Sequence, residues 1–437
     1  MEGTPTRAGS IALNASYPKA DAPLVSALKV SGAIVLAKAN MDTFAIGGAS
    51  ASQVAGVVKN PFGPDIASPA GSSCGNGAGG AAVFGVIGVG SDTSGSVMMP
   101  SANANLIGFN LAKDKLDMSG VFPLSPFCDR AGPMVRYAED LAQMLDILDI
   151  SIPSASKPFY TSQAVLNENG LQGLKIGYLQ LAYQTVDLVD DVLTWNATQE
   201  IRALFDQTLF NLAKGGASIK SCSKLTHEDL FFLEHVRVIN EARMMTTCLA
   251  NDVDYYLKGV TVNSPYHNSN ELVNSGLLPP QFGLPLSLAV ELRDQCNSSF
   301  SDYTFDRNYY RQLFVDPLFE CGDIIISLMT DIFPDANKGS IGPMHLGYLF
   351  GHPQMSFPLG FSEPKPGAPK GLPVALFATT KPNKEHLLVR MAYAYQKKFG
   401  FGVVLPASVP VPVESSGSSL IFNVPIFILM LICSVCV

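Results

Sequence analysis

The segment SSCGNGAGGAAVFGVIGVGSDTSGSVMMP, residues 72–100, decides the fold of this 437-residue chain. It consists largely of glycine, alanine, serine and small apolar residues, and Asp92 is its single charged residue. Glycine and serine at this density are typical of a flexible linker, or of a tight loop where the backbone approaches a ligand. The run GAGGAAVFGVIGVGS within it predicts a small-residue helix followed by a strand. We therefore expect a folded site here.

Two short motifs occur in this stretch, and both require a context that the sequence does not provide. Residues 71–75, GSSCG, match the G-x-S-x-G nucleophile elbow, which needs a strand directly before it. The preceding residues 60–70 contain several prolines and predict a loop. Residues 75–80 match the dinucleotide fingerprint G-x-G-x-x-G, which needs a preceding strand and a downstream acidic residue. We interpret neither motif as functional.

Two serine-rich turns flank the predicted helix and strand, Gly71–Ser73 and Asp92–Ser96. The connection between them can fold back and place Ser72 beside Ser96. A serine hydroxyl is a weak nucleophile until a base accepts its proton, and one serine can relay the proton of another. Consecutive backbone N–H groups in the second turn can also form a nest that stabilises an oxyanion. That nest would use the amides of Thr93, Ser94, Gly95 and Ser96.

The composition predicts a globular protein without nucleic-acid, metal or cofactor chemistry. Hydrophobic residues make up 47% of the chain and charged residues 15%, which is a globular balance. The net charge is −8 and basic residues do not cluster, so a nucleic-acid partner is not expected. The eight cysteines and six histidines show no zinc-ligand or redox spacing, and no cofactor is predicted.

Strand and helix patterns alternate along the chain, which predicts an α/β fold built on a central sheet. We expect one large domain over residues 1–405, followed by a Pro/Ser linker and an apolar tail over residues 406–437. Asn383 is the expected cap of the last helix. The expected helices cover residues 20–31, 137–150, 187–214 and 383–400, and the expected buried strands cover residues 33–40, 175–183, 321–330 and 372–380.

The tail Leu420–Val437 is an 18-residue run without a charge. This length only just reaches a membrane span, and Asn423 and Pro425 weaken that interpretation. The first residues lack the apolar core of a signal peptide. Membrane contact through Leu420–Val437 and an unstructured tail therefore both stay open, as do cytoplasmic and membrane-associated locations. The sequence does not predict an oligomeric state.

The motifs taken together resemble the amidase signature family of serine hydrolases. LAKANMDTFAIG (36–47), NPFGPDIASPAGSSCGNGAGGAAV (60–83) and GSDTSGSVMMP (90–100) are similar to three successive family segments. GVFPLSPFCDRAGPMVRYAEDLAQML (120–145), GHPQMSFPLGF (351–361) and GLPVALFATTKPNKEHLLVRMAYAYQ (371–396) resemble later ones. The resemblance covers residues 5–400 and implies an α/β/α fold with a mixed central sheet, trimmed at its N-terminus.

The resemblance also implies roles for individual residues. Ser96 corresponds to the nucleophile, and Ser72 corresponds to the bridging serine, which follows a cis peptide bond in the family. Ser73 and Asp92 correspond to supporting residues, and the amides of the second turn correspond to the oxyanion hole. The implied substrate is a small-molecule amide.

The sequence departs from the family pattern beside the expected nucleophile. Ser94 replaces a glycine, Met98 replaces an arginine, and residues 109–111 replace a Lys-Pro-Thr segment. The family's catalytic lysine falls a few residues before Met1 by this alignment, so we expect an incomplete Ser-Ser-Lys triad. Lys38 matches a different lysine of the family and is expected at the end of a strand.

Two functions follow from this interpretation. The first is hydrolysis of carbon–nitrogen amide bonds through an acyl-enzyme, with Ser96 as nucleophile and Ser72 as proton relay. The second is a non-catalytic relative, a pseudoenzyme or truncated isoform that binds an amide ligand or a partner without turnover. The segment over about residues 155–315 is expected to determine specificity.

Overall fold

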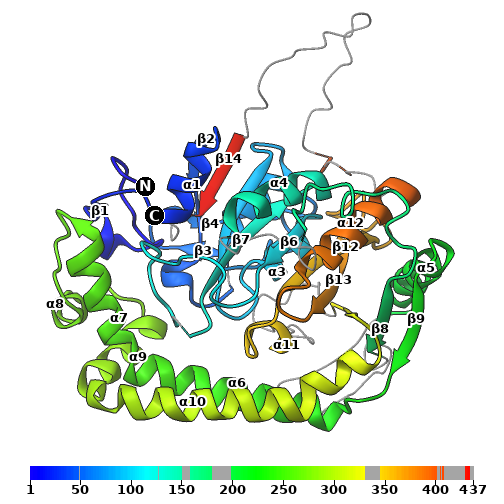
Figure 1. The fold of residues 1–437 in the computed structure, drawn as a ribbon. Helices are drawn as coiled ribbons and strands as arrows, with labels where there is room; N and C mark the ends of the chain where they lie inside the picture. Colours follow the sequence, from blue (N-terminus) through cyan, green and yellow to red (C-terminus); the bar gives the residue numbers. More distant parts are fainter. Residues whose placement is uncertain are drawn as a thin grey trace, which may run out of the picture.

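A ten-stranded mixed sheet forms the centre of the computed structural model (Figure 1). The structure describes all residues except 49, 126, 150–157, 180–197, 330–344, 401–403, 405, 408–428 and 434–437. In spatial order the strands are β2 (Ile34–Ala39), β14 (Leu429–Cys433), β5 (Ile87–Asp92), β7 (Arg130–Val135), β6 (Ile107–Asn110), β12 (Gln354–Phe361), β13 (Pro373–Thr380), β11 (Ile324–Leu328), β8 (Lys175–Leu179) and β9 (Ser218–Cys222).

The sheet combines parallel and antiparallel pairs, which confirms the α/β prediction and its mixed sheet. β14 is parallel to β2 and β5, and β8 is parallel to β9 and β11. The pairs between β5 and β11 are antiparallel. Two small sheets lie outside this one, β1 (Tyr17–Pro18) with β10 (Thr261–Val262) and β3 (Ala51–Ser52) with β4 (Gly56–Val57).

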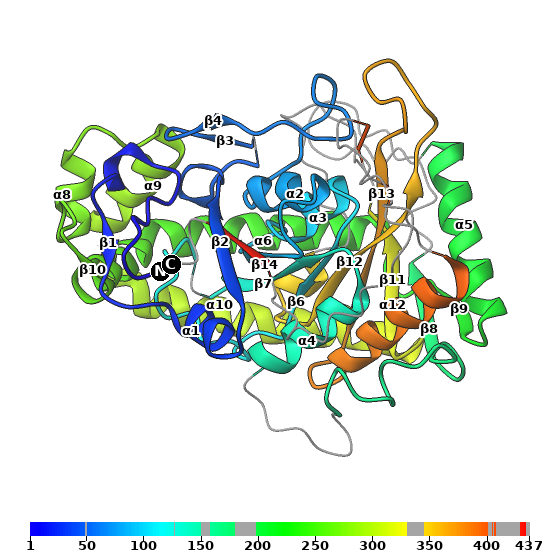
Figure 2. The same ribbon diagram turned by 90° about the horizontal axis from the view of Figure 1, so that it is seen from above.

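Helices cover both faces of the sheet, which gives the α/β/α layering (Figure 2). One face carries α2 (Cys74–Ala81) and α3 (Met98–Asn103), the two helices that adjoin the serine turns. The opposite face carries α1 (Pro23–Val30), α4 (Ala138–Leu148) and α12 (Glu385–Phe399). The serine turns therefore belong to a single packed layer on one side of the sheet.

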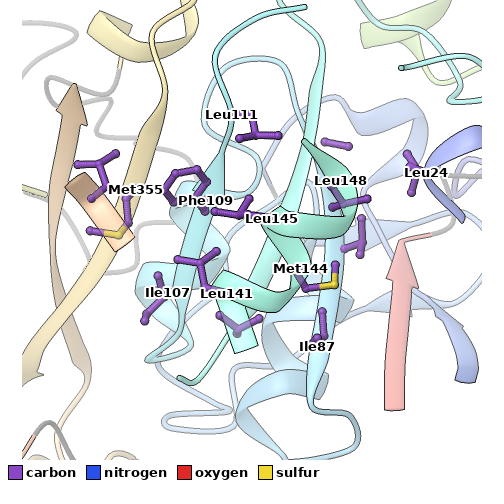
Figure 3. Close-up of a cluster of buried hydrophobic side chains, with 14 of the residues drawn as sticks. Leu24, Ile87, Ile107, Phe109, Leu111, Leu141, Met144, Leu145, Leu148 and Met355 are labelled. Atoms are coloured by element: carbon purple, nitrogen blue, oxygen red, sulfur yellow. The ribbon is translucent and has the colours of Figure 1, made fainter. Parts of the chain in front are cut away.

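The core on the second face is formed by α4 against the central strands (Figure 3). Leu141, Leu145 and Leu148 repeat at helical spacing and are fully buried. They face the apolar side chains of Ile107 and Phe109 on β6. Burial of this stripe fixes α4 on the sheet, since each such side chain contributes about 1.5–3 kcal/mol.

Residues 227–310 form a set of helices beside the sheet, which we call the helical arm (Figure 1). Two disulfides hold this part of the chain, Cys248–Cys296 within the arm and Cys222–Cys321 between the segments that precede and follow it. Neither pair was expected from the cysteine spacing. The arm comprises α6 (His227–Thr247), α7 (Leu249–Tyr255), α8 (Ser269–Asn274), α9 (Pro280–Glu291) and α10 (Cys296–Tyr310).

Most predicted elements are confirmed with shorter bounds, and two expectations are wrong. The strand expected at residues 33–40 is β2, but it is not buried, because it is an edge strand whose Leu36 is 46% exposed. The cap of α12 is Lys384, because Asn383 adopts a φ of 68°, which a helix N-cap does not. α5 (Gln199–Lys214) forms the second part of the helix expected at 187–214, and residues 187–197 lie outside the described residues.

The expected apolar tail lies mostly outside the described residues. Its segment Leu429–Cys433 forms β14, which pairs with β2 on one side and β5 on the other. Among the helices that the structure describes, none combines the length and apolar character needed to cross a membrane. The short helix α11 (His345–Tyr348) precedes β12.

Candidate active site

The structure brings the two serine turns together above β5. The amide of Ser73 donates to the carbonyl of Ser96 at 3.3 Å, which joins the first turn directly to the second. The peptide bond between Gly71 and Ser72 is cis, the geometry that the resemblance implies at this position. The carbonyl of Ser72 accepts a hydrogen bond from the amide of Asp42 at 3.0 Å. The return through α2 and β5 thus places Ser72 and Ser96 in adjoining turns, as predicted.

The two turns can approach each other closely because glycines, which have no side chain, stand at the points of contact. A Cβ at Gly90 would lie 2.5 Å from Oγ of Ser73, which donates to the carbonyl of Ser91 at 3.1 Å. A Cβ at Gly75 would collide with the backbone of Asn40 on the neighbouring segment. The small-residue composition that resembled a linker is therefore a packing requirement.

Asp92 determines the shape of the second turn. Its side chain is fully buried, and its carboxylate accepts the amides of Gly95 at 2.7 Å and Val97 at 2.8 Å. Arg130 is its partner residue on β7, and the negative charge of Asp92 opposes the lowering of the pKa of Arg130 by burial. Asp92 therefore begins the turn at the end of β5 and bonds to the amides at its far end.

The predicted amide nest is partly engaged within the protein. The Gly95 amide donates to Asp92, whereas the amides of Thr93, Ser94 and Ser96 have no acceptor among the residues that the structure describes. Gly95 takes a positive φ of 112°, a conformation that favours glycine, and Ser94 is not among the residues with positive φ. The replacement of the family glycine by Ser94 thus places no strain on the backbone.

The two serine side chains differ in accessibility. Ser72 is 1% exposed, and its buried Oγ has no hydrogen-bond partner among the described residues. Ser96 is half-buried, so a ligand can reach it. An unpaired buried hydroxyl is unfavourable in a folded protein, and the described residues include others, among them Oγ of Ser16, Ser101 and Ser356.

Lys38 lies at the end of β2 and is held by the N-terminal segment. Its Nζ donates to the carbonyl of Pro5 at 2.9 Å and to Oγ1 of Thr6 at 2.8 Å. These contacts agree with the expected strand-end role. Met98, which replaces the family arginine, is fully buried and packs in an apolar cluster with Val97 and Met134. An apolar side chain therefore occupies the place of a charged donor.

Asp129 is a site residue that sequence reasoning did not single out. Its Oδ1 accepts the hydroxyl of Thr93 at 2.6 Å, and its carboxylate also accepts the amides of Leu124 and Ser125. Burial raises the pKa of this carboxyl, while the hydrogen bond from Thr93 opposes the rise. The available signal was its place within the CDRAGPM segment, residues 128–134.

The family model described as Amidase matches residues 1–257 of this chain. That match covers more than half of the 437 residues, and the chain belongs to the amidase family. The order of the quoted motifs and the adjoining serine turns agree with this membership. The resemblance found in the sequence is thus confirmed at the level of the family.

Curated relatives and solved structures extend the comparison. The chain is 35% identical over 180 residues to a glutamyl-tRNA(Gln) amidotransferase subunit from Marinomonas sp., covering 40% of this chain and 37% of the relative. It is 26% identical over 419 residues to the corresponding protein of Symbiobacterium thermophilum, covering 90% and 80%. The chain therefore spans less than half the length of the first of these relatives.

The fold is also shared with a peptide amidase from Stenotrophomonas maltophilia, whose crystal structure superposes with a TM-score of 0.74. The two chains are 23% identical, and the superposition covers 93% of this chain and 82% of the peptide amidase. This likeness confirms the amidase-signature α/β/α architecture.

Proposed function

We propose that this chain hydrolyses the C–N bond of a small-molecule amide through an acyl-enzyme on Ser96. The observation that carries the proposal is the junction of the two serine turns. A backbone hydrogen bond joins Ser73 to Ser96, and the Asp92 carboxylate holds the second turn by accepting two of its amides. The half-buried Ser96 is open to a ligand, and the buried Ser72 is shielded from water. A proton relay between them also requires Oγ of Ser96 to reach Oγ of Ser72, which makes no hydrogen bond to a described residue in this structure.

The reaction would proceed in two stages. Oγ of Ser96 attacks the carbonyl carbon and passes its proton to Ser72, which passes its own proton to a base. The amides of Thr93, Ser94 and Ser96 would stabilise the resulting oxyanion, because they are the members of the nest without an internal acceptor among the described residues. The C–N bond then breaks, the leaving amine takes up a proton, and water hydrolyses the ester formed with Ser96.

The scheme also needs a base that receives the proton of Ser72. No group among the described residues bonds to Oγ of Ser72. The amine of Lys38 is directed to Pro5 and Thr6. A positioned general base contributes about 10²–10⁴-fold to the rate. The unpaired Ser72 hydroxyl therefore favours a second candidate function, in which the chain binds an amide ligand without turnover.

Release of p-nitroaniline from a panel of acyl p-nitroanilides distinguishes these two functions. For the hydrolase we expect steady release of p-nitroaniline in proportion to protein concentration, because the aniline leaves as the ester on Ser96 forms. Ser96→Ala should lower the rate by about 10³-fold or more, and Ser72→Ala by about 10²–10⁴-fold. Ser26→Ala, on the exposed side of α1, is the matched control and should leave the rate unchanged.

The hydrolase proposal fails if folded wild-type protein shows no release above the level of Ser96→Ala. Saturable binding of an uncleaved amide in that same preparation would then support the second function. Equal rates for wild type and Ser96→Ala would assign any observed hydrolysis to another group.

A further inference from the structure

The outer side of the helical arm carries apolar residues where a surface helix usually carries polar ones. Figure 1 shows α6 and α10 along the lower edge of the molecule, away from the central sheet. On α6, the exposed residues between positions 231 and 242 recur at helical spacing, and all except His235 are apolar. These apolar residues are Phe231, Phe232, Val238, Ile239 and Ala242.

The inner side of α6 is apolar as well. Leu230, Leu233 and Val236 are buried in one apolar cluster together with Met244. A helix with apolar side chains on two sides has to be covered on both, because each side loses free energy when it faces water. The exposed stripe of α6 therefore indicates a surface that another molecule covers.

α10 extends this stripe into a broader surface. Phe305, Tyr309 and Leu313 follow one another at four-residue spacing on α10 and the helical turn after it, and all three are exposed. The rings of Phe305 and Tyr309 stack with 5.9 Å between their centroids. Tyr310 contacts Tyr309 and also Phe232 of α6, at 5.1 and 5.2 Å between ring centroids. The stripes of the two helices are therefore continuous.

This surface, which we call the aromatic face, is as large as a dimer interface requires. Its large apolar side chains are between 39% and 68% exposed, so together they present about 600 Å². A stable homodimer buries about 800 Å² on each subunit, about two thirds of it apolar. The aromatic face consists of Phe231, Phe232, Val238, Ile239, Phe305, Tyr309 and Leu313.

The charged groups beside the aromatic face favour a second copy as its occupant. Neither α6 nor α10 contains a lysine, and each arginine on these helices and the following turn has a partner within the chain. The partners are Glu234 and Glu241 for Arg237, Asp302 for Arg243, the carbonyl of Phe350 for Arg307, and Asp316 for Arg311. An anionic lipid surface attracts clusters of unpaired basic side chains, which this face does not offer. A second copy presents the same uncharged surface and needs no countercharge.

We propose that a second copy of this chain docks on the aromatic face, so that the protein forms a two-fold symmetric homodimer through α6 and α10. In such an isologous contact the same surface meets itself, and the two helices of each copy would pack together as a layer of four. Burial of the aromatic face against its counterpart would remove the apolar stripes of both copies from water. The proposal does not depend on whether Ser96 is catalytic.

Sedimentation equilibrium of the full chain tests this dimer. We expect the mass of two chains and a dissociation constant of about 1 μM or below, since interfaces of this size range from micromolar to picomolar affinity. Tyr309→Lys buries a charge in the interface from each copy and should raise the dissociation constant by about 100-fold or more. Phe305→Ser removes one ring of the stacked pair and should raise it by about tenfold.

Val30→Lys is the matched control for Tyr309→Lys. It adds the same charge at an apolar residue that is 88% exposed at the end of α1, outside the arm. The dissociation constant should be unchanged in this variant. All three substitutions lie at exposed positions, and circular dichroism checks that each variant is folded.

A wild-type chain that stays monomeric up to about 100 μM would overturn the proposal, because such an affinity is too weak for a specific dimer. A dimer that withstands both Tyr309→Lys and Phe305→Ser would overturn it as well, since another surface would then form the contact. Co-sedimentation with vesicles of phosphatidylcholine, with and without phosphatidylserine, tests a lipid surface as the occupant. Monomeric protein that binds either vesicle, and loses this binding in Tyr309→Lys, would assign the aromatic face to lipid and reject the second copy.

Discussion

In the second serine turn, the buried carboxylate of Asp92 is paired within the protein; around the end of α7, two buried side-chain oxygens have no partner among the described residues. Asp92 accepts two backbone amides, and Ser73 bonds across to β5. Asp252 and Tyr256 each retain a buried oxygen without a partner among the described residues. The difference separates a turn that its own hydrogen bonds hold in a fixed geometry from a region whose buried oxygens no described residue pairs.

Ser72 belongs to the first region but resembles the second. Its backbone carbonyl is paired with Asp42, and its hydroxyl has no partner in the described part of the chain. The unpaired hydroxyl lies where the proposed proton relay acts. The paired groups of the turns therefore fix the backbone, and we expect the unpaired Ser72 hydroxyl to take part in the reaction.

The largest effect is expected from breaking the paired region with Asp92→Ala. This change leaves the buried amides of Gly95 and Val97 unsatisfied, and it removes the negative charge beside the buried Arg130. We expect a loss of about 3–5 kcal/mol in the free energy of unfolding, measured by urea denaturation. Asp92→Asn conserves one acceptor and should cost less. A loss below about 1 kcal/mol for Asp92→Ala would contradict the structural role of this carboxylate.

The next largest loss of stability is expected from a change within the helical arm. Replacing the Cys248–Cys296 disulfide by the pair Cys248→Ser and Cys296→Ser frees the junction between α6 and α10. We expect a loss of about 2–4 kcal/mol, with proteolysis beginning within residues 227–310. Limited proteolysis with peptide mapping gives the site of the first cut. First cleavage around the serine turns would show that the two regions are not separate in stability.

A smaller change in the free energy of unfolding is expected from the titration of Asp252, which lies in the unpaired region. Burial and the negative charge of Asp129 raise the pKa of Asp252 from 3.8 to about 7. Between these two pH values the folded protein therefore retains a proton that the unfolded chain has lost. The contribution of Asp252 is therefore full below about pH 4 and is lost as the pH rises through about 7. The other titratable residues that line the same pocket as Asp252 are Asp129, Tyr255 and Tyr256.

The melting temperatures of wild type and Asp252→Asn across pH 4–8 isolate this contribution from other titrations. Asp252→Asn should gain stability relative to wild type by about 1–2 kcal/mol as the pH rises, because it removes the unpaired charge. A difference that is constant across this range would show that Asp252 titrates normally.

The fold and the position of the serine turns could be predicted from the sequence because their signals are local. Small residues over 74–81 followed by the apolar run 87–92 specify a helix and a strand, and the structure has α2 and β5 there. The apolar spacing of 137–150 likewise predicts α4. A short connection of this kind has few ways to return, so the neighbourhood of Ser72 and Ser96 could be inferred as well.

The contacts that depend on tertiary register could not be predicted. Asp129 reaches Thr93 because β7 pairs antiparallel with β5, which aligns Arg130 with Asp92. The two disulfides join cysteines 48 and 99 residues apart, and no local spacing marks them. The exposure of β2 follows from its place at the sheet edge, which its apolar sequence does not reveal.

The most direct test of Ser96 as the nucleophile is to treat the folded protein with a fluorophosphonate and to locate the adduct by peptide mass spectrometry. We predict a single adduct on Ser96, which is lost in Ser96→Ala, slowed in Ser72→Ala and unchanged in Ser26→Ala. An adduct on another residue, or folded wild-type protein without any adduct, would contradict the assignment of Ser96 as an active nucleophile.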